Sequence, residues 1–220
     1  MTYNVTEARV IFEEVKKELA QSGFNYFLQD VCDETFRKWK RVFYDMEPDV
    51  QTGISICYGC SRLVIVPPNG DYVFKIQFST EDAIDYCHNE EIIYGMASER
   101  GVEQFFAWTS FIGEYGEAQV YAMEKLEVDD DQNASDSYDY HMKNCIEDGE
   151  DEYYGEYDDH DGMIEYAQAH NGSAMDEAVR LIDEIGINDL HCGNWGYRGS
   201  TFVLVDYGGY RETLHLSNKR

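Results

Sequence analysis

The stretch that decides the fold class reads Ile187-Asn188-Asp189-Leu190-His191-Cys192-Gly193-Asn194, and it is followed by Phe202-Val203-Leu204-Val205-Asp206-Tyr207-Gly208-Gly209. The first part is a polar loop after a helix predicted over 173–185, which Gly186 closes. The second part is a β-prone run that ends in a carboxylate and glycines. An aspartate that opens such a loop can accept a hydroxyl proton, and amide and carboxylate oxygens are hard ligands suited to Mg²⁺. Asp189 is therefore a candidate general base, and Asn194 and Asp206 are candidate metal ligands.

A single lysine lies inside a predicted strand upstream of this stretch. Residues 72–76 read Tyr72-Val73-Phe74-Lys75-Ile76, after β-prone segments at 54–56 and 63–66 and a turn over 67–71. A helix that ends near Glu99 is predicted next. A lysine fixed on a strand can reach phosphate oxygens, and a helix glutamate can hold that lysine in position.

The remaining patterns complete an α+β arrangement. Apolar periodicity predicts helices over 6–22 and 33–43, and Ser79 with Asp82 forms a capping box before the helix that ends near Glu99. A further strand is predicted from residues 105–108 and 111–112 together, and another at 119–123. Consecutive strands joined by tight turns favour an antiparallel meander.

The chain is strongly acidic, with 17 basic and 44 acidic residues and a net charge of −27 over 220 residues. Such a surface repels nucleic acid and anionic membranes and attracts basic protein surfaces. Residues 127–162 concentrate acids and tyrosines, a composition typical of a solvated insert, to which the tyrosines add binding potential. No apolar run approaches the ~20 residues that span a bilayer. No signal peptide is visible at the start, and a soluble, cytoplasmic protein is expected.

Cysteine spacing offers little evidence for a metal site. Of six cysteines, only Cys57 and Cys60 have a metal or redox spacing, and a zinc site needs two more ligands. His88, or His191 with Cys192, could supply them, but no pattern links these residues to the pair. Free buried thiols are the favoured interpretation.

The loop Asp189–Asn194 followed by Val205-Asp206-Tyr207-Gly208 resembles the catalytic loop and metal-binding motif of the protein-kinase-like superfamily. It is most similar to the bacterial and aminoglycoside-phosphotransferase branches, and more loosely to the early protein kinases of T7-type bacteriophages. Val73-Phe74-Lys75-Ile76 is similar to the family's lysine strand. The resemblance spans residues 53 to 210 in separate blocks.

The resemblance implies a role for each site residue. Asp189 would be the catalytic base, and Lys75 would clamp the phosphates of ATP. Glu90 would hold Lys75, with Glu91 as the alternative, because Ile93 and Tyr94 follow Glu90 at the family's apolar spacing. Asn194 and Asp206 would bind Mg²⁺. Backbone groups of Glu124 and Leu126 would meet adenine, and Ser61 would cap phosphates in place of a glycine-rich loop, of which only Gly53 and the stretch 58–61 remain.

The implied fold is a two-lobed, protein-kinase-like α+β structure with an antiparallel N-lobe sheet and a reduced helical C-lobe. The expected domain ranges are an N-terminal helical segment over 1–50, an N-lobe over 51–126, the acidic insert over 127–162, and the reduced C-lobe over 163–220. Asn188 and Ile187 depart from the family pattern, which has Arg or Gly and His at these places.

Two functions are consistent with these features. The first is an ATP- and Mg²⁺-dependent Ser/Thr protein kinase that acts on a basic host protein, in the manner of a viral host-takeover factor. The second is a non-catalytic acidic inhibitor, a DNA mimic on a kinase-like scaffold that binds a host nucleic-acid-binding protein. Neither binds nucleic acid directly or a membrane, and either would work in the cytoplasm, that of the host cell if the protein is viral.

Overall fold

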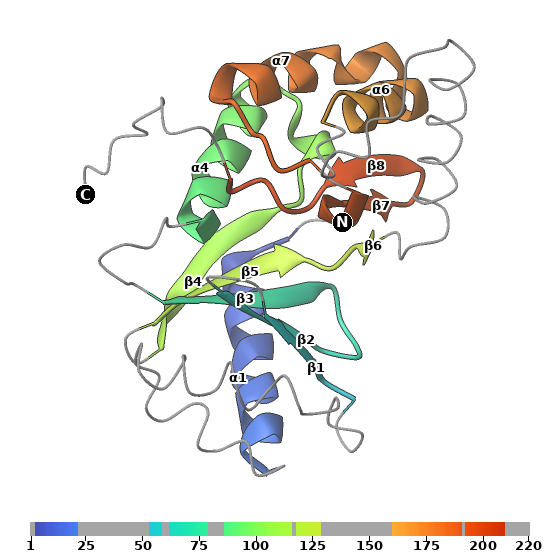
Figure 1. The fold of residues 1–220 in the computed structure, drawn as a ribbon. Helices are drawn as coiled ribbons and strands as arrows, with labels where there is room; N and C mark the ends of the chain where they lie inside the picture. The colour runs from blue at the N-terminus through green and yellow to red at the C-terminus, as the bar shows by residue number, and fades with distance from the viewer. Residues whose placement is uncertain are drawn as a thin grey trace, which may run out of the picture. The chain divides into compact units, whose positions relative to one another are not determined.

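A computed structural model describes residues 3–21, 53–58, 62–78, 86–115, 118–128, 160–190 and 192–209. The chain divides into two compact units, a first unit of Met1–Glu91 with Trp108–Lys125 and a second unit of Ile92–Ala107 with Leu126–Arg220. The described elements are helices and antiparallel sheets (Figure 1). The predicted α+β class with an antiparallel sheet is thereby confirmed.

The first unit is built on a five-stranded antiparallel sheet with the order β1-β2-β3-β5-β4. Its strands are β1 Ser55–Tyr58, β2 Arg62–Val66, β3 Tyr72–Phe78, β4 Thr109–Tyr115 and β5 Ala118–Glu124. The predicted turn over 67–71 joins β2 to β3, and Val64 pairs with Lys75 across them. Helix α4, Tyr86–Glu99, lies in the chain between β3 and β4. In the sheet, β5 lies between β3 and β4, although it follows β4 in the chain.

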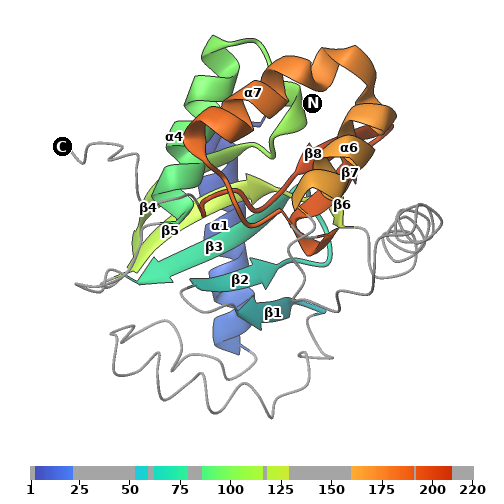
Figure 2. The same cartoon turned by 45° about the horizontal axis from the view of Figure 1, so that its top comes forward.

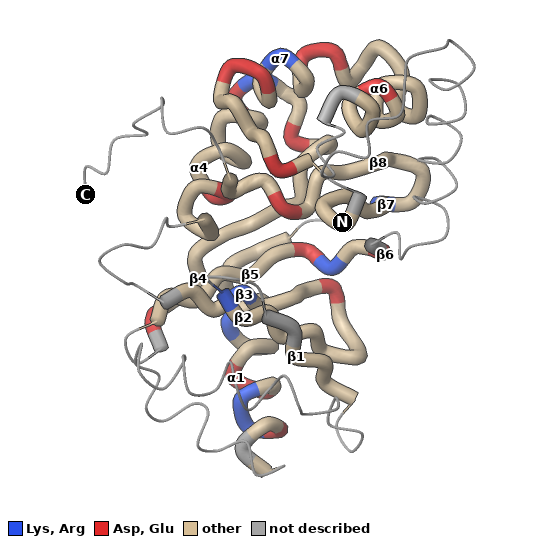
Figure 3. Tube along the Cα trace, in the orientation of Figure 1, with Lys and Arg blue, Asp and Glu red and all other residues tan. Residues whose placement is uncertain are grey.

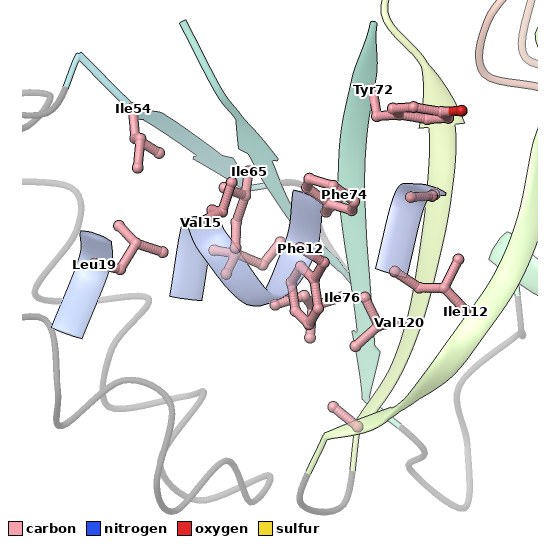
Figure 4. Close-up of a cluster of buried hydrophobic side chains, with 14 residues drawn as sticks. Phe12, Val15, Leu19, Ile54, Ile65, Tyr72, Phe74, Ile76, Ile112 and Val120 are labelled. Atoms are coloured by element: carbon pink, nitrogen blue, oxygen red, sulfur yellow. The ribbon is translucent and has the colours of Figure 1, made fainter. Parts of the chain in front are cut away.

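Helix α1, Val5–Gln21, covers one face of this sheet (Figure 2). Its Asn4 cap accepts a hydrogen bond from Glu7 N at 2.8 Å, which satisfies one of the unpaired donors of the first turn. Its apolar stripe packs against the sheet side chains shown in Figure 4, and the helix contributes Ala8, Phe12, Val15 and Leu19. The alternate residues of β3 that meet this stripe are Tyr72, Phe74 and Ile76.

The opposite face of the sheet carries a polar cluster. Because side chains alternate along a strand, Val73, Lys75 and Gln77 of β3 point away from α1, as does Arg62 of β2, which pairs with Gln77. Helix α4 lies against this face, since Cys87 N donates to Gln77 Oε1 at 2.8 Å. The two faces of one sheet therefore differ: the face under α1 is apolar, and the face under α4 includes charged groups.

The second unit contains a smaller antiparallel sheet of order β6-β7-β8, with β6 Glu127–Val128, β7 Trp195–Arg198 and β8 Thr201–Leu204. Its helices are α6 His160–Asn171 and α7 Asp176–Ile185, with short 3₁₀ turns at Glu103–Phe105, Gly172–Met175 and Cys192–Asn194. Trp195 and Phe202 stack with ring centroids 5.0 Å apart. Asn171 ties α6 to β8, donating to Phe202 O at 2.8 Å and accepting from Phe202 N at 2.9 Å.

Several sequence predictions need correction or lie outside the described residues. The strand predicted from residues 105–108 and 111–112 is confirmed only in its second part, because β4 begins at Thr109. Before it, Glu103–Phe105 is a 3₁₀ turn and Phe106 makes a single bridge to Leu204. The helix predicted over 173–185 begins as a 3₁₀ turn and is α-helical only from Asp176. Helix α6 and strand β7 were not predicted. The helix expected over 33–43, the capping box at 79–82 and residues 129–159 lie outside the described ranges.

Replacement of two glycines of the second unit by alanine is expected to change the free energy of unfolding in opposite directions. Gly186 closes α7 in the left-handed region, at φ 73°, where its N–H bonds Ile182 O at 2.9 Å. Gly95 lies in the exposed interior of α4, where an added methyl group meets nothing within 4 Å. We expect Gly186→Ala to lower the free energy of unfolding by ~1–2 kcal/mol and Gly95→Ala to raise it by ~0.5–1 kcal/mol. Urea unfolding of both variants checks this, and equal effects would contradict the backbone assigned to Gly186.

Candidate functional site

Lys75 and Glu90 form a buried ion pair in the first unit. Lys75 Nζ lies 2.8 Å from both Oε1 and Oε2 of Glu90. Lys75 is 3% exposed and Glu90 is fully buried. The lysine comes from the middle of β3 and the glutamate from the second turn of α4, so two rigid elements fix the pair.

Arg62 is a second cation on the same carboxylate. Its Nη1 donates to Glu90 Oε1 at 3.1 Å, and its guanidinium lies 5.9 Å from the centre of the Tyr86 ring. Arg62 begins β2 and shares the sheet face of Lys75, as the strand register requires. These basic positions on β2 and β3 are coloured blue in Figure 3. Glu90 therefore links two cations from neighbouring strands.

The surroundings of this cluster shift its proton affinities. Burial lowers the pKa of Lys75 below its ordinary value. The Glu90 carboxylate acts in the opposite direction and raises this pKa, whereas the positive charge of Arg62 lowers it further. Burial also acts to lower the pKa of Arg62, but the Glu90 carboxylate leaves it raised above the usual arginine value. Burial, with help from Glu90, raises the pKa of the Cys87 thiol to about 12. The thiol is therefore neutral at physiological pH and is a poor nucleophile.

Glu91, the other helix glutamate considered from the sequence, has different partners. Its Oε1 accepts hydrogen bonds from Phe111 N at 2.9 Å and from Ser110 Oγ at 3.0 Å, both on β4. Glu91 thus fastens α4 to the edge strand near the register shift at Phe111 and Gly113. The residue bonded to Lys75 is Glu90.

The loop that carries Asp189 is held by buried neighbours in the second unit. Ile187 and Leu190 are 1% and 2% exposed, and Trp195 Nε1 donates to Leu190 O at 3.3 Å. Between these anchors, Asp189 is exposed at the surface. A carboxylate in this position is accessible to a substrate hydroxyl while its backbone stays fixed.

Asn194 joins this loop to the residue after β8. Its Nδ2 donates to Asp189 O at 2.8 Å, and its own carbonyl accepts from Val205 N at 2.7 Å and from Asp206 N at 3.4 Å. Asn194 is 5% exposed, and Asp206 is half-buried. Tyr207 is anchored by a hydrogen bond from its hydroxyl to Ala107 O. Three sequence-predicted residues, Asp189, Asn194 and Asp206, are therefore brought together on adjoining segments of one unit.

Asn194 and Asp206 carry an amide oxygen and carboxylate oxygens, which are ligand types that Mg²⁺ accepts. Mg²⁺ is ordinarily bound by one or two protein carboxylates or similar oxygens, with water and substrate phosphates completing the octahedron. In the described part of the chain, no group of three or more His, Cys, Asp or Glu side chains that could hold a metal ion occurs. One amide and one carboxylate can bind Mg²⁺ only where a bound polyphosphate supplies further oxygen ligands.

The residues expected near adenine are divided between the units. Glu124 ends β5 in the first unit, is fully buried, and its N–H donates to Trp108 O at 2.9 Å. Leu126 is half-buried and belongs to the second unit. Ser61, expected to cap phosphates, and the side chains of Cys57 and Cys60 lie outside the described residues.

No protein-family model matches the chain, and no curated protein sequence does.

The predicted site residues are divided between the two units. Lys75 and Glu90 belong to the first unit, and Asp189, Asn194 and Asp206 belong to the second. Within the described ranges, no helix has the length and apolarity needed to cross a bilayer.

Arg62 is the residue of this site that sequence reasoning missed. It begins a short apolar strand and belongs to no motif. The signal that could have found it is the strand alternation. Arg62 and Val64 are two residues apart, so their side chains lie on the same face of the sheet, and Val64 pairs with Lys75. That signal becomes readable only when the register of β2 on β3 is known.

Proposed function

We propose that the chain is an ATP- and Mg²⁺-dependent phosphotransferase of protein-kinase-like architecture that transfers phosphate to Ser or Thr hydroxyls of a basic protein. Lys75 would contact the phosphates, held by Glu90. Glu124 and Leu126 would meet adenine through backbone groups, and Ser61 would cap phosphates. Asn194 and Asp206 would hold Mg²⁺, and Asp189 would orient the acceptor hydroxyl and take its proton.

The observation that carries this proposal is the buried Lys75–Glu90 pair on the central strand of a sheet ordered β1-β2-β3-β5-β4. Burying two charges costs desolvation free energy that their attraction often only just offsets, so stability alone is a weak reason for such a pair. A lysine in a fixed position on a strand is, however, what phosphoryl transfer needs.

The second unit supports the chemical half of the proposal. Asp189 is exposed on a loop anchored by Ile187 and Leu190, so it can accept a proton without moving the backbone. Asn194 holds that loop through Asp189 O and meets the backbone of Asp206. When bound, Mg²⁺ would neutralise charge on the transferred phosphoryl group.

The net charge of −27 supports a basic protein as the substrate. A positively charged partner is drawn to such a surface, while nucleic acid and anionic lipid are repelled. A viral factor that modifies a basic protein in the cytoplasm of a host cell fits this combination.

The same charge favours a second candidate, an acidic inhibitor that imitates DNA and occupies a host nucleic-acid-binding protein. This protein would use the sheet and helices as a scaffold and would need neither ATP nor Mg²⁺. Its binding would weaken steeply as salt rises, because charge mimicry is screened.

Label transfer separates the two functions. The purified protein is incubated with γ-labelled ATP and Mg²⁺, alone, with a basic protein, and with a cell lysate. We expect labelled Ser or Thr, abolished when EDTA removes Mg²⁺. Absence of labelled protein in every mixture, from a protein whose circular dichroism reports intact structure, would reject the phosphotransferase and leave the salt-sensitive inhibitor.

A further inference from the structure

Arg62 is a charged residue of the Lys75 cluster that has no task in the proposed phosphoryl transfer. Its side chain is 12% exposed, and its Nη1 and Lys75 Nζ both donate to Glu90 Oε1, at 3.1 Å and 2.8 Å. One carboxylate thus holds two cations from adjacent strands on the same face of the sheet. Shared bonds of this kind fix the two cations relative to each other.

The charges of the three linked side chains do not cancel. Lys75 and Arg62 contribute two positive charges and Glu90 one negative charge, so the linked group carries +1 in a chain whose total is −27. Cys87 adds no negative charge, because its thiol pKa is raised to about 12. Coulombic interactions are stronger in a buried site than in water, so this local excess of positive charge favours binding of an anion.

The chemistry of the guanidinium selects the class of anion. The guanidinium of Arg62 carries its five N–H donors in a fixed planar fork, and Nη1 bonds Glu90 Oε1 at 3.1 Å. The planar fork of arginine matches two oxygens of a phosphate, whereas lysine acts as a point charge. The guanidinium carbon also lies over the Tyr86 ring, 5.9 Å from its centre, in a cation–π contact. Arg62 and Lys75 together are suited to a polyphosphate rather than to a single carboxylate.

The sequence also lacks a glycine-rich loop, whose backbone N–H groups commonly bind the phosphates of a nucleotide. A cationic side chain compensates for part of this loss, because charge-assisted hydrogen bonds are about twice as strong as neutral ones.

We propose that Arg62 is a second phosphate-binding cation, which contacts the polyphosphate of the nucleotide beside Lys75. This inference rests on the proposed phosphotransferase function, since it assigns a further residue to the same nucleotide site. Glu90 then has two tasks, because it positions both the lysine and the arginine.

The test compares nucleotide affinities of wild type, Arg62→Gln and Arg62→Lys by titration calorimetry with Mg²⁺. Arg62→Gln is expected to weaken ATP binding by about 10- to 100-fold, the range for one lost charge-assisted hydrogen bond. Affinity for adenosine should stay within about twofold, because a loss confined to phosphate contacts leaves the base untouched. Arg62→Lys should recover part of the ATP affinity. Arg180→Gln, which removes an exposed arginine of α7 with a 68% exposed side chain, should change neither affinity.

The outcomes distinguish failure of this inference from failure of the function. If the wild type binds no ATP, the proposed function falls. If the wild type binds ATP and Arg62→Gln binds it equally well, the function stands and the role of Arg62 falls. A merely structural arginine would instead lower the melting temperature and weaken adenosine and ATP alike, which also rejects the inference.

A second measurement needs no variant and covers the case in which Arg62→Gln fails to fold. Phenylglyoxal modifies arginine, and mass spectrometry reports the extent at each site. ATP and inorganic tripolyphosphate, each with Mg²⁺, should protect Arg62 while adenosine does not. Equal modification of Arg62 with and without tripolyphosphate would overturn the inference.

Discussion

Asp206→Ala is expected to lower phosphoryl transfer by about 10³-fold or more, because a metal-bound charge clamp supplies several kcal/mol of transition-state stabilisation. The variant removes the one carboxylate of the proposed metal pair, leaving only the amide of Asn194. The backbone N–H of Asp206, which donates to Asn194 O, is retained. The loss is therefore chemical, and we expect the free energy of unfolding to stay within about 1 kcal/mol of wild type.

The measurement is the rate of label transfer at saturating ATP over a range of Mg²⁺ concentrations, with a melting curve for each variant. Asp183→Ala is the matched control, because Asp183 is an exposed aspartate of α7 with no part in the site. Asp206→Ala should need far more Mg²⁺ or reach no plateau. A variant with wild-type rate and wild-type Mg²⁺ dependence would remove Asp206 from the metal site.

Asp189→Ala separates proton transfer from metal binding. Asp189 is exposed, and its carbonyl, not its side chain, accepts the bond from Asn194. The variant should keep the Mg²⁺ dependence of ATP binding while kcat falls by about 10²–10⁴-fold, the usual contribution of a general base. A parallel fall in ATP affinity would argue that Asp189 binds rather than accepts a proton.

The two halves of the candidate site differed in how far sequence could predict them. Asp189, Asn194 and Asp206 lie within one loop–hairpin segment, and the β7–β8 pairing sets Trp195 opposite Leu204, so short chain connections bring them together. Their proximity follows from local pattern, even though β7 itself was missed. Lys75 could be placed on a strand from sequence, and Glu90 on a helix, but residue spacing alone left Glu91 as an alternative.

Long-range pairing explains what could not be predicted. Whether Glu90 or Glu91 meets Lys75 depends on the rotation of α4 over the sheet, which the bonds of Glu91 to β4 help to set. Arg62 joins the cluster only through the register of β2 on β3. The apolar stripe of α1 was visible in the sequence, but nothing local says that it covers the face of β3 opposite Lys75. Each of these features depends on how segments far apart in the chain pack or pair, which local sequence patterns do not determine.

Glu90→Ala is expected to destabilise the protein by about 3–5 kcal/mol, the usual cost of leaving one partner of a buried ion pair uncompensated. Glu90 is fully buried and Lys75 is 3% exposed, so water cannot replace the lost carboxylate without local opening. Arg62 loses its partner at the same time. The measurement is urea unfolding, with Glu114→Ala as the control, since Glu114 is an exposed glutamate of β4 and should change stability by no more than about 0.5 kcal/mol.

The pH dependence of that loss identifies its cause. Burial and Arg62 already act to lower the pKa of Lys75, and removal of Glu90 takes away the group that raises it most. A lysine with a folded pKa below its unfolded value releases its proton first in the folded state. The unfolded state then binds more protons, and the unfolding free energy rises with pH between the two pKa values, up to about 10.4. The deficit of Glu90→Ala should therefore shrink as pH rises from neutral towards about 10.

A double variant shows whether charge or packing is responsible. Lys75→Met with Glu90→Gln removes both charges of the pair and keeps an amide oxygen for Arg62, so it should recover at least half of the stability lost in Glu90→Ala. A deficit as large as that of Glu90→Ala, and independent of pH, would mean that the carboxylate matters for packing. A double variant with full wild-type stability that no longer binds ATP would show that the ion pair is needed for nucleotide binding and not for folding.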